Sequence, residues 1–348
     1  VSVFEKERYP AMETSFANGG QLSASNAEVW TNWKTIFQGI KWLSRKDAPL
    51  LFNLKPTIHK LSWILDFLRN IPNHKKNTIA TTVMAIESRK EFNRILRDEG
   101  LKIDLEKKGI IHFYTTKENF QHGLKINEWL NEAGLNRYPI SVEKIKSIEP
   151  TINLKNVYGG FYTESDMTGD IHLFTKQLSD ICIKNGVKFN FESYVTNIKN
   201  LNEKIKIKFQ KNNQYEEDIF SGVVICAGVN SKILASHVND KVNIYPVKGY
   251  SITVMLNDKQ SQASAPIVSL LDDEMKIVTS RLGKNRFRIA GTAEFNGYNK
   301  DIRNDRIDPL IKWCNKYFPG VSTEYCIPWA GLRPMTPSMM PKVGKGSV

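Results

Sequence analysis

The first 23 residues, VSVFEKERYPAMETSFANGGQLS, constrain the fold more than any other segment. A short apolar strand ends at an acid, Glu5, and a turn of hydroxyl, amide and glycine residues follows at 14–21. An acid at the end of a buried strand is what a nucleotide-binding sheet uses to hold a ribose hydroxyl. A turn of this composition offers backbone N–H groups to a pyrophosphate. The segment predicts a nucleotide-binding α/β fold entered part-way, because no first strand with a glycine-rich turn precedes it.

Cysteine and histidine spacing argues against a metal centre. The chain has 4 cysteines without a C-x-x-C spacing, and Cys226 lies in the apolar run VVICAG, which predicts a buried thiol. The 6 histidines are scattered, and none has a partner three or four residues further along. We therefore predict no zinc site and no other histidine-based metal site.

Positive charge is concentrated in residues 34–108, which hold 16 Lys/Arg and 8 Asp/Glu in a chain of net charge +13. Aromatic residues such as Phe37, Trp42 and Trp63 accompany these cations. The mixture fits an anionic membrane surface, a nucleic acid, or the solvated face of ordinary helices. Of the first two, the membrane is favoured, because the aromatics recur at helical spacing and no nucleic-acid-binding motif accompanies them.

Hydrophobic periodicity predicts the secondary structure of most of the chain. Helices are predicted over 31–43, 57–69, 77–99, 117–133, 173–184 and 305–317. Strands are predicted over 108–116, 245–256, 275–282 and 286–295, with a small antiparallel meander over 187–220. Residues 222–228, GVVICAG, form a continuous apolar run ending in glycine, which is typical of a strand buried on both faces of a parallel sheet. No linker separates these blocks, so we expect interleaved domains.

Five sequence pieces occur in an order that resembles a known family. They are VFEKE, ETSFANGGQLS, ICAG, YPVKGYS and WAGLRPMTPSMMPKVG. Together they resemble the flavin-dependent D-amino-acid oxidase superfamily, which includes glycine oxidase and sarcosine oxidase. KGYS, ESDMTGD at 164–170 and GLRPMTP are similar to its bacterial D-amino-acid dehydrogenase branch in particular. The resemblance runs along nearly the whole chain, and the combination is far more specific than any one piece.

The resemblance implies an α/β fold in which a Rossmann-type FAD-binding domain is interleaved with a substrate domain built on an antiparallel sheet with helices. It assigns residues 1–30, 156–240 and 326–348 to the FAD-binding domain, and 31–155 and 241–325 to the substrate-binding domain. The GxGxxG turn and the C-terminal glycine-rich segment of the family are not found in the sequence. We therefore expect a fragment that lacks both termini, and whether this chain retains FAD is left open.

The resemblance also implies roles for individual residues. Arg333 is expected to grip the substrate carboxylate with two parallel hydrogen bonds, and Tyr250 to donate a hydrogen bond to the same group. Lys248 is expected near the flavin, with an ordinary turn lysine as the alternative. For Asn18 and Gln21 the alternative is that they satisfy the turn backbone. The expected FAD contacts are Glu5 and Lys6 at the ribose, Thr14, Ser15, Asn18, Gly19, Gly20 and Gln21 at the pyrophosphate and flavin edge, Val195 at the adenine, and Ala227 and Gly228 over the cofactor.

The resemblance implies an FAD-dependent enzyme that oxidises D-amino acids to 2-oxo acids and ammonia by hydride transfer from the substrate Cα to flavin N5. It implies electron transfer to a quinone of the respiratory chain and a cytoplasmic protein. From its charge and aromatic residues, we expect 34–108 to provide a contact to the cytoplasmic face of the inner membrane. No nucleic acid is expected as a partner. Two alternatives stay open: a glycine- or sarcosine-type amine oxidase that uses oxygen, and a non-catalytic basic module that binds membrane or nucleic acid. The preferred D-amino acid and the oligomeric state are not fixed by the sequence.

Overall fold

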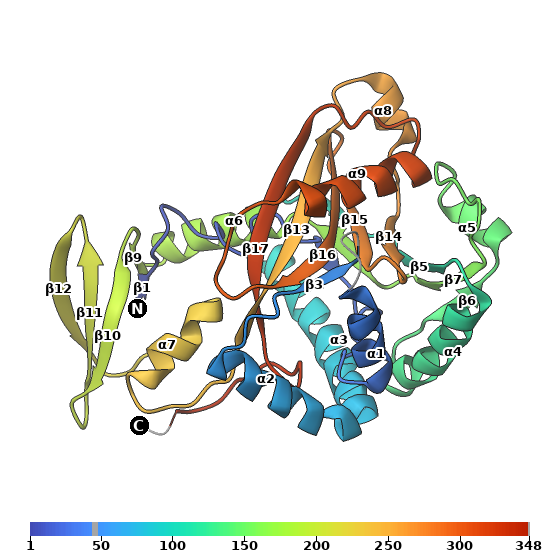
Figure 1. Cartoon of the computed structure of the whole chain (residues 1–348). Coiled ribbons are helices and arrows are strands. Elements are labelled where there is room, and N and C mark those ends of the chain that lie inside the picture. The colour runs from blue at the N-terminus through green and yellow to red at the C-terminus, as the bar shows by residue number, and fades with distance from the viewer. Residues whose placement is uncertain (44–47, 347–348) are drawn as a thin grey trace.

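The computed structural model describes residues 1–43 and 48–346, and in this part of the chain its centre is a mixed sheet of nine strands (Figure 1). In spatial order the path is β17 (Cys326–Met335), β13 (Tyr245–Met255), β16 (Arg286–Phe295), β15 (Ile277–Leu282), β14 (Ser269–Asp272), β5 (Ile110–Tyr114), β7 (Gly159–Thr163) and β6 (Tyr138–Ile140), and β3 (Leu50–Phe52) pairs with β16 beside it. Most neighbours are antiparallel, while β14 pairs with β5, and β16 with β3, in parallel.

Three small sheets surround this centre. The first pairs β1 (Ser2–Phe4) with β9 (Lys188–Asn190) in parallel. The second is the meander β10 (Tyr194–Asn200), β11 (Ile205–Lys211) and β12 (Gln214–Phe220). The third consists of β2 (Gln21–Leu22), β8 (Met167–Gly169) and β4 (Leu105–Glu106). The first two sheets lie together at the left of Figure 1.

Helices surround these sheets. They are α1 (Trp33–Trp42), α2 (Ile58–Arg69), α3 (His74–Asp98), α4 (Lys117–Glu132), α5 (Val142–Ile148), α6 (Ile171–Lys184), α7 (Ser231–Ser236), α8 (Lys259–Ser264) and α9 (Asn304–Tyr317), with 3-10 turns η1 (Ile71–Asn73) and η2 (Gly228–Asn230). Several begin at a residue whose side-chain oxygen accepts a backbone N–H of the first turn, as Asn32, Thr57 and Asp170 do. Such caps satisfy N–H groups that a helix start leaves without an internal partner.

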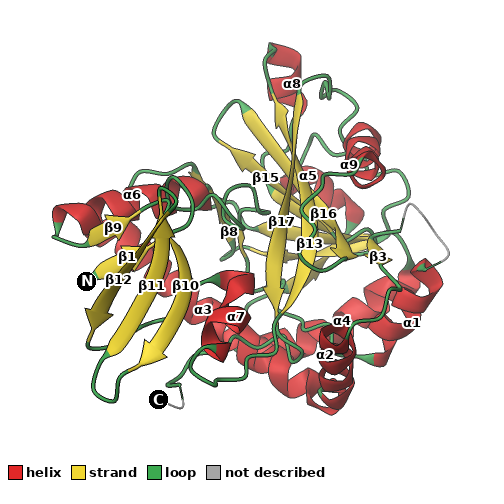
Figure 2. Cartoon of the chain, turned by 60° about the vertical axis from the view of Figure 1, so that its left-hand side comes forward, coloured by secondary structure: helices red, strands yellow, loops and turns green. Residues whose placement is uncertain are grey.

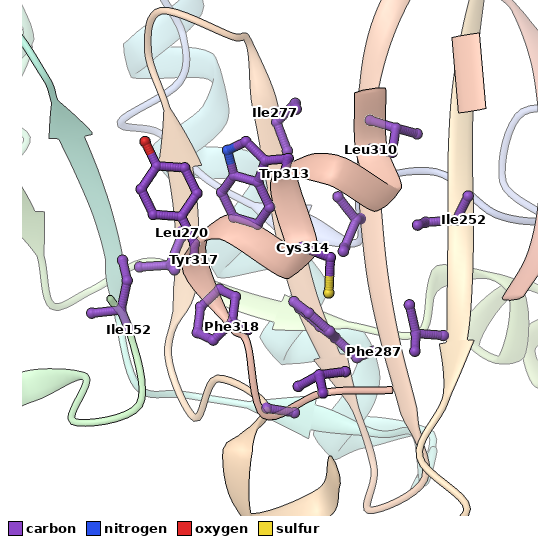
Figure 3. Close-up of a cluster of buried hydrophobic side chains, with 14 of the residues drawn as sticks. Ile152, Ile252, Leu270, Ile277, Phe287, Leu310, Trp313, Cys314, Tyr317 and Phe318 are labelled. Carbon is purple, nitrogen blue, oxygen red and sulfur yellow. The ribbon is translucent and has the colours of Figure 1, made fainter. Parts of the chain in front are cut away.

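Two hydrophobic cores lie on opposite faces of the strand pair β13–β17. On one face α9 packs its Leu310 and Cys314 against Ile252 and Phe287 of the sheet (Figure 3). On the other face α2 packs against the lower ends of the strands, with Trp63 among its buried residues (Figure 2). The sheet is therefore covered on one side by α9 and on the other by the α2 region and the amino-terminal turn.

The predicted helices are confirmed, with ends that shift by a few residues, and so are the strands predicted over 245–256, 275–282 and 286–295. The strand predicted over 222–228 is wrong. That segment is irregular, Val224 is 86% exposed, and Cys226 is exposed rather than buried. An apolar run becomes a strand only where a neighbour completes its hydrogen bonds, and no described residue pairs with this one.

β17 was not predicted, because its sequence is rich in proline and glycine. It nevertheless pairs with β13 over ten residues, from Tyr245↔Met335 to Val254↔Cys326. Residues 326–335 therefore share a sheet with the strands of 245–295. The division of the chain into FAD-binding and substrate-binding segments stays a prediction.

Candidate functional site

The register between β13 and β17 decides which side chains meet. Val247 lies opposite Arg333, and Gly249 lies opposite Gly331. Residues that face each other in an antiparallel pair project to the same side, and successive residues alternate between sides. Arg333 therefore shares a face with Val247, which packs in the α2 core, and not with the residues that pack under α9.

Arg333 is exposed and has no acidic partner among the residues that the structure describes. Within residues 1–43 and 48–346, no carboxylate lies within ion-pair distance of its guanidinium, and its Cζ lies over the ring of Trp30, 5.6 Å from the ring centroid. Protein packed around the group lowers the pKa of Arg333 below its usual value, although solvent reaches the side chain. Solvent reaches the guanidinium, which is therefore available to an anionic ligand, and we call this solvent-open place beside Arg333 the hollow.

The surface beside Arg333 is bare at Gly249, which lies opposite Gly331 in the strand pair. A β-carbon at Gly249 would meet no atom within 4 Å, so the space above it is open. A β-carbon at Gly331 would instead collide with the indole of Trp329, which lies over that glycine. The open surface at Gly249 is therefore bordered by the guanidinium of Arg333 and the ring of Trp329.

The turn at 14–21 crosses the same face of the sheet, contacting one strand after another. The Thr14 hydroxyl donates to the carbonyl of Leu332 on β17, at 3.2 Å. Ser251 of β13 donates to the carbonyl of Ala17, at 2.7 Å, and Ser280 of β15 donates to that of Gly19. The sheet therefore fixes the position of the whole turn.

The spacing of residues along β13 gives the length of the open surface between Arg333 and the turn. Val247, opposite Arg333, and Ser251, which holds the turn, are four residues apart on β13, which corresponds to roughly 13 Å at 3.3 Å per residue. Gly249 lies midway between them. A small carboxylate bound by Arg333 would thus lie over Gly249 and beside the turn.

The polar residues of the turn also have structural roles. Asn18 accepts the N–H of Gly20 through Oδ1 at 3.0 Å, and Gln21 donates through Nε2 to Ser269 at 2.7 Å. Gly20 has a φ of +64°, which favours glycine, and a β-carbon at Gly19 would collide with Val278 at 2.6 Å. Ser15 is half-buried within the turn. In the structure, Asn18 therefore satisfies the backbone of the turn, and Gln21 bonds to a neighbouring strand.

The predicted ribose-binding residues lie at the end of β1. Glu5 accepts the N–H of Glu7 through one carboxylate oxygen, at 3.0 Å, and no described residue forms an ion pair with it. Its carbonyl accepts the N–H of Ser193, which brings it close to Val195 on β10. Lys6 is instead engaged by Glu13 and, at 3.5 Å, by Glu7. The backbone of Glu5 is therefore bonded two residues before Val195, whereas the Lys6 ammonium is held by acids of its own loop.

Ala227 and Gly228 lie where the irregular segment 222–227 enters η2, which packs against β17. Gly228 has a φ of +55°, and a β-carbon there would meet no atom within 4 Å. The turn is thus open on the glycine side and adjacent to the strand that carries Arg333.

Tyr250 and Lys248 lie on the opposite face from Arg333. The Tyr250 hydroxyl donates to Glu294 at 2.5 Å, and Lys248 Nζ lies 3.0 Å from the same carboxylate. All three side chains are buried, and burial is the main cause that raises the pKa of Tyr250. The structure does not bring Tyr250 to the hollow beside Arg333. Tyr250 lies three residues after Val247 on β13, so the two side chains project to opposite faces of the sheet. These two residues belong to a buried charged cluster instead.

The acids of the ESDMTGD piece anchor the turn and its surroundings. Asp166 accepts the N–H groups of Ala24 and Ser25, just after the turn, and pairs with Arg89. Asp170 caps α6 and lies 2.8 Å from Arg286. Residues 164–170 therefore hold the chain just after the turn through Asp166 and the start of α6 through Asp170.

Sequence reasoning missed the residues that hold the turn and border the hollow. They are Trp30, Ser251, Ser280, Arg288 and Trp329. A weak signal existed for Ser251, a polar residue within the apolar strand YSITVML. No local signal existed for the others, because their role depends on which strand lies beside which.

Comparison with known proteins fits this geometry. The whole chain, residues 1–348, matches the DAO family of FAD dependent oxidoreductases. The chain belongs to this family. It is 52% identical over 348 residues to D-amino acid dehydrogenase 3 of Mesorhizobium japonicum, an alignment that covers 100% of this chain and 84% of the relative. It is 38% identical to D-amino acid dehydrogenase of Dechloromonas aromatica, covering 99% of this chain and 83% of the relative.

Solved structures share the fold. Glycine oxidase from Geobacillus kaustophilus superposes with a TM-score of 0.72 at 16% identity, covering 100% of this chain and 79% of that one. L-alpha-glycerophosphate oxidase from Mycoplasma pneumoniae, solved with FAD bound, gives a TM-score of 0.67 at 18% identity over 97% of this chain and 77% of that one. The mixed α/β fold expected from the sequence is confirmed, and FAD is the cofactor of the family.

The residues of this chain fit FAD in two respects. The Glu5 carboxylate keeps acceptor capacity for a ribose hydroxyl, because no described cation neutralises it and the N–H of Glu7 occupies only one oxygen. The surface at Gly249, between the turn and Arg333, is open, so the turn has free space on the side of Arg333. Glu5 and the 14–21 turn would therefore hold the cofactor.

Proposed function

We propose that this chain carries the catalytic core of an FAD-dependent D-amino acid dehydrogenase. The observation that carries the proposal is Arg333, an exposed guanidinium that has no acidic partner among the described residues and borders the open surface at Gly249. A planar guanidinium matches a carboxylate with two parallel hydrogen bonds. The 52% and 38% identities to proteins named D-amino acid dehydrogenase support the substrate class.

Bound FAD supplies the oxidation, by accepting a hydride from the substrate Cα. The chain's own part is to bind and orient the substrate. Arg333 fixes the carboxylate, and the bare Gly249 lets Cα approach the turn at 14–21 without steric hindrance. Trp30 and Trp329 border the hollow and reduce the access of water. The amino acid loses a hydride and a proton to give an imino acid, which water converts to a 2-oxo acid and ammonia.

The test of this proposal is Arg333→Lys in the FAD-loaded protein. Lysine keeps the charge but loses the second parallel hydrogen bond, so KM for a D-amino acid should rise by about tenfold to a hundredfold while FAD content stays unchanged. Arg69→Lys, at an exposed arginine of α2, is the matched control and should leave KM unchanged. Loss of flavin from the Arg333 variant would assign Arg333 a structural role and overturn the proposal.

We further infer that the electrons pass to a quinone of the respiratory chain rather than chiefly to oxygen, and that the protein works at the cytoplasmic face of the inner membrane. Exposed apolar helices within residues 34–108 support a membrane contact, and residues 44–47 of that region lie outside the described residues. Reduction of a quinone analogue under anaerobic conditions tests the acceptor. Fast oxygen uptake with peroxide formation on glycine or sarcosine would favour the oxidase alternative.

A further inference from the structure

Helices α1 and α2 carry apolar stripes that face away from the protein. Trp33, Phe37 and Ile40 recur along α1 at helical spacing, and Ile58, Leu61 and Leu65 do so along α2. Each of these six side chains is between 52% and 89% exposed. We name these six residues the α1–α2 surface.

The α1–α2 surface is not what holds the helices to the protein. Trp63 and Phe67 of α2 are buried in the core on the lower part of β13 and β17, and Ile36 of α1 packs against the same core. The exposed stripes lie on the other sides of these helices. Burial of apolar side chains is the main source of stability, so six large ones left exposed on two neighbouring segments mark an interaction surface.

The charge around this surface is mainly positive. Residues 33–43 and 48–69 contain four lysines, Arg69 and one acid, Asp66, which pairs with Arg69 at 3.0 Å. Lys41 and Lys55 are exposed, whereas Lys60 is buried and donates to the carbonyls of Asn53 and Lys55. Lysines beside exposed aliphatic and aromatic side chains are typical of helices that lie in the interface of an anionic membrane.

Figures 1 and 2 place α1 and α2 at the same end of the molecule. Trp63 donates through Nε1 to the carbonyl of Met335 at 2.8 Å, which ties α2 to the strand that carries Arg333. No helix in the part of the chain that the structure describes is long and apolar enough to cross a membrane.

We propose that the α1–α2 surface docks on an anionic lipid bilayer, with its apolar stripes inserted at the boundary between headgroups and acyl chains. This inference deepens the membrane contact of the proposed function by naming the residues and the lipid charge. The exposed lysines attract anionic headgroups, and the six apolar side chains enter the interface. In the docked protein, β17, which carries Arg333, would lie one helix diameter, or roughly 10 Å, from the lipid.

Charge decides between lipid and a second copy of this chain. A two-fold interface would bring the same lysine-bearing surface of both copies together, so that the exposed lysines would repel each other. Aliphatic side chains, which do not stack on bases, make up four of the six exposed residues. An anionic bilayer satisfies both the charge and the apolar character.

Co-sedimentation with vesicles at low salt tests the proposal, using phosphatidylglycerol mixed with phosphatidylcholine and phosphatidylcholine alone. Phe37→Ser with Ile58→Ser should weaken binding about tenfold or more, and Lys41→Glu with Lys55→Glu about tenfold. The matched controls are Tyr215→Ser with Ile219→Ser on β12, which are also exposed, and Lys184→Glu with Lys312→Glu. Both controls should sediment like the wild type.

Three results would overturn the proposal that this surface docks on lipid. They are no vesicle binding by the wild type, equal binding to both kinds of vesicle, or an equal loss of binding in the variants and the controls. A wild type that dimerises, and becomes monomeric with Phe37→Ser, would assign the surface to a second copy. Oxidation of D-amino acids with a soluble electron acceptor tests the proposed function independently of the docking surface. Intact oxidation without vesicle binding leaves the dehydrogenase standing, and vesicle binding without oxidation overturns only the dehydrogenase.

Discussion

Lys248 and Arg333 are cations on two directly paired strands, and they meet opposite environments. Lys248 is fully buried, lies 3.0 Å from Glu294, and donates to Asn299 at 2.7 Å and to the carbonyl of Asp301 at 3.0 Å. Arg333 is exposed and has no acidic partner among the described residues. The partner of Lys248 in the register is Leu332, one residue before Arg333.

The difference follows from the two-residue period of a strand. A shift of one residue moves a side chain from the face under α9 to the face that carries the amino-terminal turn. On the first face every donor of a cation must be satisfied within the protein, because burying an unpaired charge is costly. On the second face an unsatisfied cation is free to bind a ligand. The residue type alone therefore does not separate structural from functional cations.

The largest expected effect on stability comes from Lys248→Met. This change removes the nearer cation, at 3.0 Å, from the buried Glu294 carboxylate and leaves only Arg303, at 3.8 Å. Breaking a buried pair costs about 3 kcal/mol of unfolding free energy. Arg333→Lys should change the unfolding free energy by less than about 0.5 kcal/mol, because the side chain is exposed. Urea denaturation measures both. Equal losses in the two variants would break the contrast between the faces.

The pH dependence of stability tests the same cluster through Glu294. Burial raises the pKa of Glu294, but hydrogen bonds from Tyr250 and Lys248 outweigh it and hold the pKa below its usual value of 4.5. A carboxyl with a lowered folded pKa stabilises the protein above the unfolded value, and that stability is lost as pH falls through the folded pKa. Glu294→Gln should therefore be less stable than the wild type at pH 7.

The gap between wild type and Glu294→Gln should narrow in urea titrations below about pH 4.5, where the unfolded carboxyl takes up its proton. A gap that stays constant from pH 7 to pH 3 would show that Glu294 contributes by packing and not by charge.

A smaller effect is expected from Tyr250→Phe. It removes one hydrogen bond to Glu294, which still accepts from Lys248 and, at 2.9 Å, from Asn296, so the cost is about 1 kcal/mol. KM for a D-amino acid should change less than about twofold, since the phenol lies on the α9 face. Steady-state kinetics checks this. A tenfold rise in KM would restore the expectation that Tyr250 binds the substrate carboxylate.

The smallest effect is expected at the surface. Lys300 Nζ lies 2.8 Å from Glu13, but the two side chains are 50% and 34% exposed. Exposed pairs contribute less than about 1 kcal/mol and weaken with salt, so Lys300→Gln should lower the unfolding free energy by only about 0.5 kcal/mol. A loss as large as that of Lys248→Met would mean that burial is not what separates these two lysines.

Local patterns predicted most of the helices and strands because their periods are set by the backbone. The apolar spacing around Leu310 and Cys314 predicted α9, and the alternation in YPVKGYSITVML predicted β13. The same reasoning failed for GVVICAG, because an apolar run requires a neighbouring strand that local sequence does not specify. It also missed β17, where proline and glycine masked a strand that β13 completes.

The sequence by itself determined the family, the order of its elements and the choice of Arg333, because these depend on motifs and on the local periods of helix and strand. Only the tertiary structure decided that Arg333 opens to a hollow while Lys248 and Tyr250 are buried under α9. That outcome rests on the pairing of β13 with β17, segments about 80 residues apart in the chain. Whether a side chain is buried or open depends on which distant elements cover its side of the sheet, and no local sequence pattern encodes that.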